Sequence, residues 1–543
     1  MALSVIMSIV SRTIRRFGCG FYLVAPRKQR RLPGSLGTLM GICIALLCIA
    51  HPAIARIELA HVFGDHMVLQ ADMPIEVWGA GAPGEAIAVT LGKATRSTVA
   101  NAKGQWLVSF APRAASREAI QIQVQGSNAI RVKNVLVGEV WLAAGQSNMA
   151  WPLSRVENAQ SEIEQSDQPE LRLYHLAGSA PTGARAYTPE EFSRLAPEDF
   201  LSGDWKPCSP ETAASFSAVA YFFGKRLHQE LQVPIGILCP PIGGTPTEAW
   251  IRRDALVESQ QLSTLVKGPW LENQGLCEWC RERAKVNLDW GVVDRSKLLG
   301  DDLGPYHPYQ PGYMWQAGVA PLRRLRLRGV IWYQGESNAE SANLVAQHRP
   351  LLETLVTDWR TQFRHPSMPF LFVQLPGLNR PHWPAFRQSQ HECSESIENA
   401  DMVVTIDLGH PTNVHPPDKQ PIGNRLANLA LDTVYARSDG HSFPIAVDAR
   451  IKGQTAWITF EETGDALVSK DGDPIRHFEI AGNDGKFVPA SASLERNSIV
   501  VWNDDVLTPR FVRYAWLPYP RPPINLVNEA GLPASPFKLP VKP

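Results

Sequence analysis

The chain has 543 residues, which is too long for one ordinary domain and favours two to four. An apolar fraction of 44% and a charged fraction of 20% are typical of a soluble globular protein. Basic and acidic residues balance at 53 each, and no basic stripe or run follows the first 55 residues. This pattern argues against nucleic acid as a partner.

Residues 1–55 are predicted to be a signal peptide. They hold seven Lys and Arg but no Asp or Glu, and they end in the apolar run "GTLMGICIALLCIA" followed by "HPAIAR". That run has about the length of a signal-peptide core and is short for a membrane span of roughly 20 residues. Cleavage before Arg56 would give a periplasmic or secreted protein with no stable membrane insertion. An uncleaved N-terminal anchor is the alternative.

Residues 56–135 are predicted to form an N-terminal β domain. Runs rich in β-branched and aromatic residues, such as "MPIEVWG", "QWLVSF" and "AIQIQVQG", are separated by the turn signals "GAGAPG" and "NAKG". In the last run Ile120, Ile122 and Val124 alternate with glutamine, which places one face of the strand inside. These features predict a small β-sandwich.

Residues 136–435 alternate between predicted strands and predicted helices. The strands are "VLVGEVWLAAG", "VPIGILCPPIGG", "LRGVIWYQGESN", "MPFLFVQL" and "DMVVTIDL", and the helices are "FSAVAYFFGKRLHQEL", "LVAQHRPLLETLVTDWRTQF" and "IGNRLANLALDTVYA". This order predicts a parallel α/β sheet with helices on both faces, in three layers. Polar segments near 155–210 and 252–310 interrupt it as insertions. Residues 436–543 return to short β runs and form a predicted C-terminal β region.

Polar residues follow four of the predicted strands, where an open parallel sheet binds its ligands. The clusters are Gln146-Ser147-Asn148, Gly243-Gly244-Thr245, Gln334 to Asn338, and the segment with His410 and His415. Together they supply a hydroxyl, free backbone N–H groups, amides, carboxylates and an imidazole. Acyl transfer through a covalent intermediate needs this set: a nucleophile, a base for its proton, and donors for the oxyanion.

Each piece also has a purely structural interpretation. Ser147 stands at a strand-to-helix junction, where a serine is often a helix cap. The Gly243-Gly244 pair fits an ordinary turn. Glu336 would be favourable in the first turn of a helix, and a single histidine is commonly structural. Their joint occurrence at successive strand ends favours the catalytic interpretation.

Four sequence blocks make the pattern specific: "GEVWLAAGQSNMAWPL", "GGTPTEAWI", "RGVIWYQGESNA" and "NVHPPDKQPIGNRLA". They resemble the signature blocks of the sialate O-acetylesterase family, which belongs to the SGNH-type hydrolases. The flanking stretches "LAHVFGDHMVLQADMPIEVWG" and "VRYAWLPYPRPPINLVNEAGLPASPF" also resemble that family. The resemblance implies an SGNH/flavodoxin-like three-layer parallel sheet with flanking β-sandwich-like regions.

The same resemblance implies roles for individual residues. Ser147 would be the nucleophile, and His415 the base that activates it and later protonates the leaving sugar hydroxyl. The oxyanion would be held by the backbone N–H of Ser147, a backbone N–H at Gly243 or Gly244, and a side-chain amide. Gln334 is the first choice for that amide and Asn338 the second.

The acid that would orient His415 stays open. Many SGNH hydrolases carry Asp three residues before the histidine, but Thr412 stands there in this chain, beside Asn413. Related carbohydrate acetylesterases use the Glu of the "QGES" block, which indicates Glu336, and Asp407 is the alternative. A Ser-His pair helped only by Asn413 is the third possibility. His410 is a rival base, but its surroundings do not match the family block.

The resemblance implies a serine esterase that removes O-acetyl groups from carbohydrates, with O-acetylated sialic acid the first candidate substrate. Acetylxylan or another polysaccharide is the alternative substrate, and a non-catalytic carbohydrate-binding protein is the alternative of another class. We expect no metal and no organic cofactor, and the oligomeric state is open. Cys277 and Cys280 in "CEWC" have redox-like spacing, but no second pair completes a zinc site, so a local disulfide or free thiols are expected.

Overall fold

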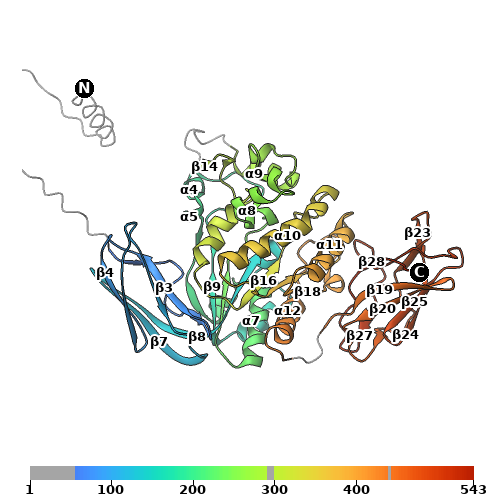
Figure 1. Ribbon diagram of the computed structural model, residues 1–543, viewed down its shortest axis with the longest axis horizontal. Helices are drawn as coiled ribbons and strands as arrows, with labels where there is room; N and C mark the ends of the chain where they lie inside the picture. The colour runs from blue at the N-terminus through green and yellow to red at the C-terminus, as the bar shows by residue number, and fades with distance from the viewer. Residues whose placement is uncertain (1–55, 290–298, 438–441) are drawn as a thin grey trace, which may run out of the picture. The chain divides into compact units, whose positions relative to one another are not determined.

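The computed structural model describes residues 56–289, 299–437 and 442–543 (Figure 1). The predicted signal peptide lies outside the described residues. Within the described ranges, no helix combines the length and the apolar character that crossing a membrane requires.

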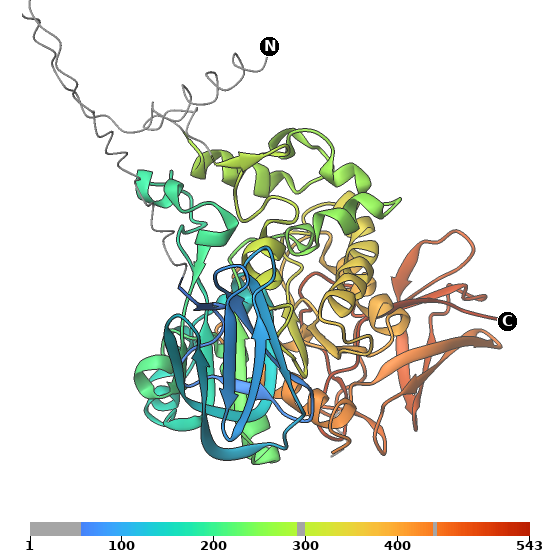
Figure 2. The ribbon, with the colours of Figure 1, turned by 60° about the vertical axis from the view of Figure 1, so that its left-hand side comes forward.

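The N-terminal β region begins with an antiparallel sheet of β1, β3 and β6 (Glu58–Leu59, Ile75–Ala80 and Gln105–Phe110), seen at the front of Figure 2. β6 alternates strictly between exposed and buried residues, so one of its faces packs inside. A second antiparallel group contains β4, β5 and β7 (Ala86–Leu91, Ala94–Val99 and Ser116–Gln125). The short strand β2 (Val68–Gln70) pairs in parallel with β8 (Ala129–Gly145). The two groups pack their apolar faces inward.

Strand β8 (Ala129–Gly145) connects this region to the central sheet without a break. Its first half pairs antiparallel with β7, and its second half pairs in parallel with β13 and β16. All residues from Val135 to Gly145 are buried, because this half of the strand is covered on both faces. The boundary predicted at 135–136 therefore falls inside one continuous strand, which carries the chain directly to Ser147.

The central sheet has the order β12-β9-β13-β8-β16-β17-β18. Its further members are β9 (Gln168–His175), β12 (Trp205–Cys208), β13 (Ile235–Cys239), β16 (Gly329–Tyr333), β17 (Phe370–Val373) and β18 (Ala400–Val403). All neighbours on this path are parallel except β12, which is antiparallel to β9, so the sheet is mixed. β9 and β12 come from the polar segment 155–210, which the sequence analysis interprets as an insertion into the sheet. The short run "LRLYH" becomes a strand because it fits beside β13.

Four long helices pack on the sheet: α7 (Ala218–Leu231), α10 (Ala342–Gln362), α11 (Trp383–Ser396) and α12 (Gln420–Thr433). α7 packs against α12, and α10 packs against α11. Three of the four match the predicted helices. α11 was not predicted, because much of its buried face is polar and breaks the apolar periodicity on which the prediction rests. The buried polar residues on it are Arg387, Ser389, Gln390 and His391.

Short elements fill the connections around the carboxyl ends of the strands. They are α2 (Ser147–Ala150), η2 (Leu153–Arg155), α3 (Ala159–Glu164), β10 (Ala177–Gly178), α4 (Pro189–Ser193), α5 (Pro197–Phe200), β11 (Leu201–Ser202), α6 (Pro210–Ala213), η3 (Thr247–Trp250) and η9 (Ile406–Leu408). The segment 252–310 contributes α8 (Arg253–Glu258), η4 (Ser263–Val266), η5 (Trp270–Glu272), α9 (Glu278–Asn287), β14 (Gly300–Asp301) and β15 (Gly304–Pro305). The π-helix η7 (Trp315–Val319) and the 3-10 helix η8 (Ala320–Leu322) lead into β16.

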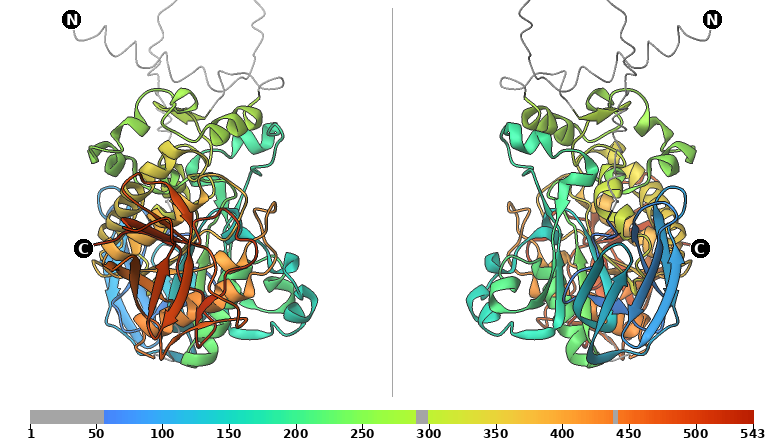
Figure 3. Two further views of the ribbon diagram at one scale, coloured as in Figure 1. Left: turned by 90° about the vertical axis from the view of Figure 1, so that its right-hand side faces the viewer. Right: turned by 90° about the vertical axis from the view of Figure 1, so that its left-hand side faces the viewer.

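The C-terminal β region contains two antiparallel four-stranded sheets (Figure 3, left). One is formed by β19, β20, β25 and β24 (Ile445–Lys452, Thr455–Glu461, Ser498–Trp502 and Ser491–Glu495). The other is formed by β23, β22, β26 and β28 (Phe487–Pro489, Phe478–Ala481, Phe511–Tyr514 and Phe537–Pro540), and β21 and β27 (Leu467–Ser469 and Leu526–Asn528) pair separately. The molecule is thus a mixed α/β protein with β regions at both ends of the described chain.

Candidate active site

Ser147 is presented by a sharp turn at the end of β8. Gly145 has φ of +137°, and a Cβ atom there would lie 2.1 Å from the Tyr333 carbonyl oxygen, so only glycine fits. The backbone N–H of Gln146 donates to the same Tyr333 oxygen at 3.0 Å. Gln146 is the N-cap of α2 and Ser147 is the first residue of the helix. The serine side chain is therefore not used as a cap.

The Ser147 hydroxyl meets the imidazole of His415. Its Oγ lies 2.7 Å from Nε2 of His415, in hydrogen-bond geometry. Trp151 stacks on the imidazole, with ring centroids 4.9 Å apart and an interplanar angle of 22°. Asn413 holds the loop: its Oδ1 accepts from the His415 N–H at 2.9 Å and its Nδ2 donates to the His415 carbonyl at 2.8 Å. These contacts fix the ring against the hydroxyl.

The environment of His415 favours its neutral form. Burial lowers the pKa of His415, and the charge of Lys419 lowers it further. A neutral imidazole can accept the serine proton, so the electrostatics suit a general base at neutral pH. His410 lies in the same loop, but its Nδ1 accepts the backbone N–H groups of Thr412 (3.2 Å) and Asn413 (2.9 Å). It makes no hydrogen bond to Ser147.

Neither predicted acid forms a hydrogen bond with His415. Both oxygens of Asp407 accept from Arg425, at 2.8 and 2.6 Å. Glu336 is buried, and its Oε1 accepts from Nδ2 of Asn148. Among the described residues, the Ser147 contact is the only hydrogen bond of the His415 ring. Glu336 therefore does not orient the imidazole through a direct hydrogen bond.

Asn148 connects Glu336 with the loop of His415. Its Nδ2 donates both to Glu336 and to the carbonyl oxygen of Val414, the residue before His415, at 3.0 Å. Its Oδ1 accepts from Nζ of Lys419 at 2.5 Å. One side chain, adjacent to the nucleophile, therefore ties the His415 loop to a buried carboxylate and a buried ammonium group.

Lys419 was not singled out by the sequence reasoning, although the "HPPDK" block contains it. Its side chain is fully buried, and burial lowers its pKa to about 7. Burial also raises the pKa of Glu336, whose Oε2 has no hydrogen-bond partner among the residues that the structure describes. A buried carboxylate and a buried ammonium group stabilise each other's charged forms, so removing either one exposes the other to the full cost of desolvation.

Gly243 lies directly beside the nucleophile. A Cβ atom at Gly243 would be 3.5 Å from Cβ of Ser147. The Gly243 carbonyl accepts from the hydroxyls of Thr182 (2.9 Å) and Tyr309 (3.1 Å). The Gly244 carbonyl accepts from the Ser337 hydroxyl at 3.0 Å, and Gly244 has φ of +78°. In the described part of the chain, the N–H groups of Ser147 and Gly243 have no hydrogen-bond acceptor.

The two predicted amide donors are engaged elsewhere. Nε2 of Gln334 donates to Oδ1 of Asn338 at 2.6 Å and to Oε1 of Gln146 at 3.2 Å. Nδ2 of Asn338 donates to the buried carboxylate of Glu248 at 3.0 Å. Oε1 of Gln146 also accepts from the backbone N–H of Ser337 at 3.4 Å. These donors fix the orientation of the Gln146 amide, and its Nε2 has no acceptor within the described residues.

The segment 252–310 forms one wall next to the glycine pair. A Cβ atom at Gly244 would lie 2.2 Å from the Tyr309 hydroxyl and 3.0 Å from the Trp279 ring. Trp279 remains 41% exposed, so its ring is open to solvent. Cys277 and Cys280 in the same segment are buried free thiols, and Sγ of Cys280 donates to the Gly244 carbonyl at 3.6 Å. Burial raises the pKa of Cys280, which disfavours a reactive thiolate.

This chain is similar to known carbohydrate esterases in both a family model and individual sequences. A family model described as "Carbohydrate esterase, sialic acid-specific acetylesterase" matches residues 309–432. Sialate O-acetylesterase from Mus musculus is 26% identical over 90% of this chain and 94% of its own length. The Pongo abelii protein of the same name is 27% identical over 92% of this chain and 96% of its own.

A solved structure agrees over nearly the whole chain. The crystal structure of a carbohydrate acetylesterase from Xanthomonas citri is 30% identical, with a TM-score of 0.72, and the match covers 89% of this chain and 99% of that one. The resemblance identified from the sequence blocks is confirmed. The chain belongs to the carbohydrate esterase family described as sialic acid-specific acetylesterases, and it is a carboxylic ester hydrolase that removes O-acetyl groups from carbohydrates.

Proposed function

We propose that the enzyme deacetylates O-acetylated sialic acid with Ser147 as nucleophile and His415 as general base. The observation that carries this proposal is the 2.7 Å contact between the serine hydroxyl and the imidazole, at the carboxyl edge of a sheet. The substrate is inferred from the names of the mouse and orangutan relatives.

The reaction begins when Ser147 Oγ attacks the acetyl carbonyl carbon while His415 Nε2 takes its proton. The resulting tetrahedral oxyanion collapses, the bond to the sugar oxygen breaks, and His415 returns the proton to that oxygen. Water then attacks the acetyl-serine ester with His415 again acting as base, and acetate leaves. Trp151 keeps the imidazole on the line between hydroxyl and leaving group through both steps.

The oxyanion is stabilised in this proposal by the backbone N–H groups of Ser147 and Gly243 and by Nε2 of Gln146. Their lack of other acceptors supports the assignment. Gln334 and Asn338, predicted from the resemblance as the amide donor, would instead hold Gln146 in place. Fixed donors of this kind need no reorganisation during the reaction, and one is worth about 3 kcal/mol.

Glu336 acts as a positioning residue in this scheme. It would anchor Asn148, which in turn holds the Val414 carbonyl and thereby the loop of His415. Lys419 balances its charge. Asp407, held by both of its hydrogen bonds to Arg425, would stabilise the fold.

Two further parts of the proposal concern architecture and location. The region 136–435 would be an SGNH-type domain of three layers, consistent with its largely parallel sheet and its two packed helix pairs. The leader-like composition of residues 1–55 supports a periplasmic or secreted enzyme.

The decisive experiment measures acetate release from 9-O-acetylated sialic acid and from acetylated xylan at matched ester concentrations. We expect kcat/KM to favour the sialic acid by at least tenfold. A preference for xylan would replace the proposed substrate while leaving the esterase chemistry intact. Sugar binding without acetate release from either substrate would overturn both.

A further inference from the structure

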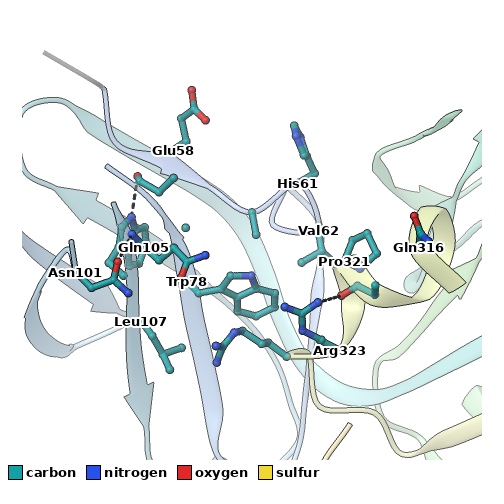
Figure 4. A pocket seen from close by; sticks show the side chains of 16 residues that line it. Glu58, His61, Val62, Trp78, Asn101, Gln105, Leu107, Gln316, Pro321 and Arg323 are labelled. Carbon is teal, nitrogen blue, oxygen red and sulfur yellow. Dashed lines mark hydrogen bonds between the residues drawn. The ribbon is translucent and has the colours of Figure 1, made fainter. Parts of the chain in front are cut away.

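A cavity of about 770 Å³ lies away from Ser147, between the N-terminal β region and the helices η7 and η8 (Figure 4). Its volume is within the usual range for sites that bind small ligands. None of the residues of the active site described above lines it. The residues that line it include Trp78, Gln105, Leu107, Gln316, Arg323 and Arg324.

One wall of the cavity is an apolar platform on the outer face of the β1-β3-β6 sheet. Trp78 and Leu107 are direct partners across β3 and β6, so their side chains lie together on that face. Trp78 is half-buried and Leu107 is 37% exposed, although their size would favour burial. Phe63 packs edge-on against Trp78 at 4.7 Å and holds its ring in place. The platform is accessible from solvent.

Polar side chains without partners surround this platform. The side-chain amides of Gln105 and Gln316 form no hydrogen bond with any described residue. Gln316 is the exposed residue of the π-helix η7, whose other members are buried. Asn101 accepts two backbone N–H groups through Oδ1, at 2.9 and 3.0 Å, which leaves its amide nitrogen available. Amides donate and accept, as recognition of sugar hydroxyls requires.

The opposite wall is positively charged. Among the described residues the Arg323 guanidinium forms one hydrogen bond, to the Ala320 carbonyl at 3.4 Å, and Figure 4 shows it reaching toward Trp78. Arg324 lies 3.7 Å from Glu76, but that carboxylate is already paired with Arg364 at 2.7 Å. A second hollow shares Arg323 and Arg324 with this cavity and is also lined by Arg364. The lining contains two arginines, Arg323 and Arg324, and one carboxylate, Glu58. This excess of positive charge favours an anionic ligand.

We propose that this cavity is a second, non-catalytic carbohydrate site that binds an acidic glycan. The apolar face of one pyranose ring would stack on Trp78 and Leu107. The sugar carboxylate would pair with Arg323 and Arg324, and Gln105 and Gln316 would bind hydroxyls. Binding there does not require Ser147, so the enzyme would hold a glycan chain independently of the hydrolysis of its acetyl esters.

The test is calorimetric titration of the full chain carrying Ser147→Ala with sialyllactose and, separately, with lactose. We expect sialyllactose to bind at least tenfold more tightly than lactose. Adding Trp78→Ala should weaken sialyllactose binding at least tenfold, or remove one of two binding events if the active site also holds the sugar. Trp502→Ala, at a similarly exposed tryptophan of the C-terminal sheet, is the matched control and should change nothing.

A second variant tests the site independently in case Trp78→Ala disturbs the fold. Arg323→Glu with Arg324→Glu changes side chains at the cavity edge and should abolish the preference for sialyllactose over lactose. With Ser147 intact, both sets of variants should retain turnover of p-nitrophenyl acetate, which reports on folding and on the proposed catalytic chemistry separately. Unchanged sialyllactose affinity and stoichiometry in both variants, or equal binding of lactose and sialyllactose by the parent, would overturn the proposal.

Discussion

The active site and the cavity at the N-terminal β region differ in how their polar groups are satisfied. Beside Ser147, the side chains of Asn148, Gln334 and Asn338 are buried, and each is engaged by two or more hydrogen bonds. In the cavity, Gln105 and Gln316 have no partners within the described chain. A satisfied network keeps catalytic dipoles fixed before substrate arrives, whereas unpartnered surface groups can adapt to hydroxyls of a bound sugar. The active site thus holds its side chains in a satisfied network and leaves the proposed oxyanion donors free, whereas the cavity leaves the amide side chains themselves free to bind a ligand.

Removing the proposed nucleophile should have the largest effect on activity. Ser147→Ala should lower kcat for p-nitrophenyl acetate by a factor on the order of 10⁴ to 10⁶, because the fixed donors cannot replace the covalent step. Ser154→Ala, at an exposed serine nearby, is the matched control and should keep full turnover. Near-wild-type activity of Ser147→Ala would contradict the nucleophile assignment.

Two histidines in one loop allow a matched test of the base. His415→Gln should lower kcat by roughly 10² to 10⁴, the usual contribution of a general base, since Nε2 can no longer accept the serine proton. His410→Gln should stay within a few-fold of wild type, because within the described chain its ring forms hydrogen bonds only with backbone N–H groups and a threonine hydroxyl. Steady-state rates with both variants decide between them, and the reverse ranking would make His410 the base.

The oxyanion assignment predicts a smaller loss. Gln146→Ala should lower kcat by about 10²-fold with little change in KM, which corresponds to one donor of about 3 kcal/mol. Gln334→Ala and Asn338→Ala should cost less, since they act by holding Gln146. Thermal unfolding checks that each variant is folded. A larger loss in either of the last two would return the role to the residues that the family resemblance implies.

Glu336 and Asp407 are expected to differ in role: Glu336 positions the catalytic loop, and Asp407 stabilises the fold. Glu336→Gln should lower kcat by roughly 10- to 100-fold, because Lys419 loses its counter-charge and Asn148 is held less firmly. Asp407→Asn should leave kcat nearly unchanged and lower the free energy of unfolding by about 1–3 kcal/mol through loss of its pair with Arg425. Urea unfolding and kcat measured on both variants test this split. A greater kcat loss in Asp407→Asn would identify it as the acid.

The smallest effect concerns the pH profile. His415 must be neutral to act as base, so kcat/KM should rise with pH through its pKa, which burial and Lys419 place below 6.5. Lys419 is protonated in that range, since its own pKa is about 7. Lys419→Met removes the positive charge, and the midpoint of the acid limb should move to higher pH. Lys470→Gln, at an exposed lysine, should leave the midpoint unchanged, and no shift in Lys419→Met would refute the electrostatic coupling.

Much of the fold followed from local patterns. Alternation of isoleucine and valine with glutamine predicted the two faces of β7, and apolar periodicity predicted α7, α10 and α12. α11 was missed because its buried face contains Arg387 and Gln390, whose burial depends on partners elsewhere in the chain. β9 was missed because its short run sits in a polar segment and becomes a strand only beside β13.

The sequence by itself determined the strand ends, the order of the polar clusters and the family to which they belong. Only the tertiary structure decided which groups meet: Ser147 and His415 are 268 residues apart, and Asn148 and Lys419 are 271 apart. It also placed Glu336 on Asn148, Asp407 on Arg425, and Trp78 in a basic cavity. The physical reason is that periodicity and turn signals report the burial and backbone conformation of a residue. The identity of a hydrogen-bond partner depends on how distant strands and loops pack, which no local pattern encodes.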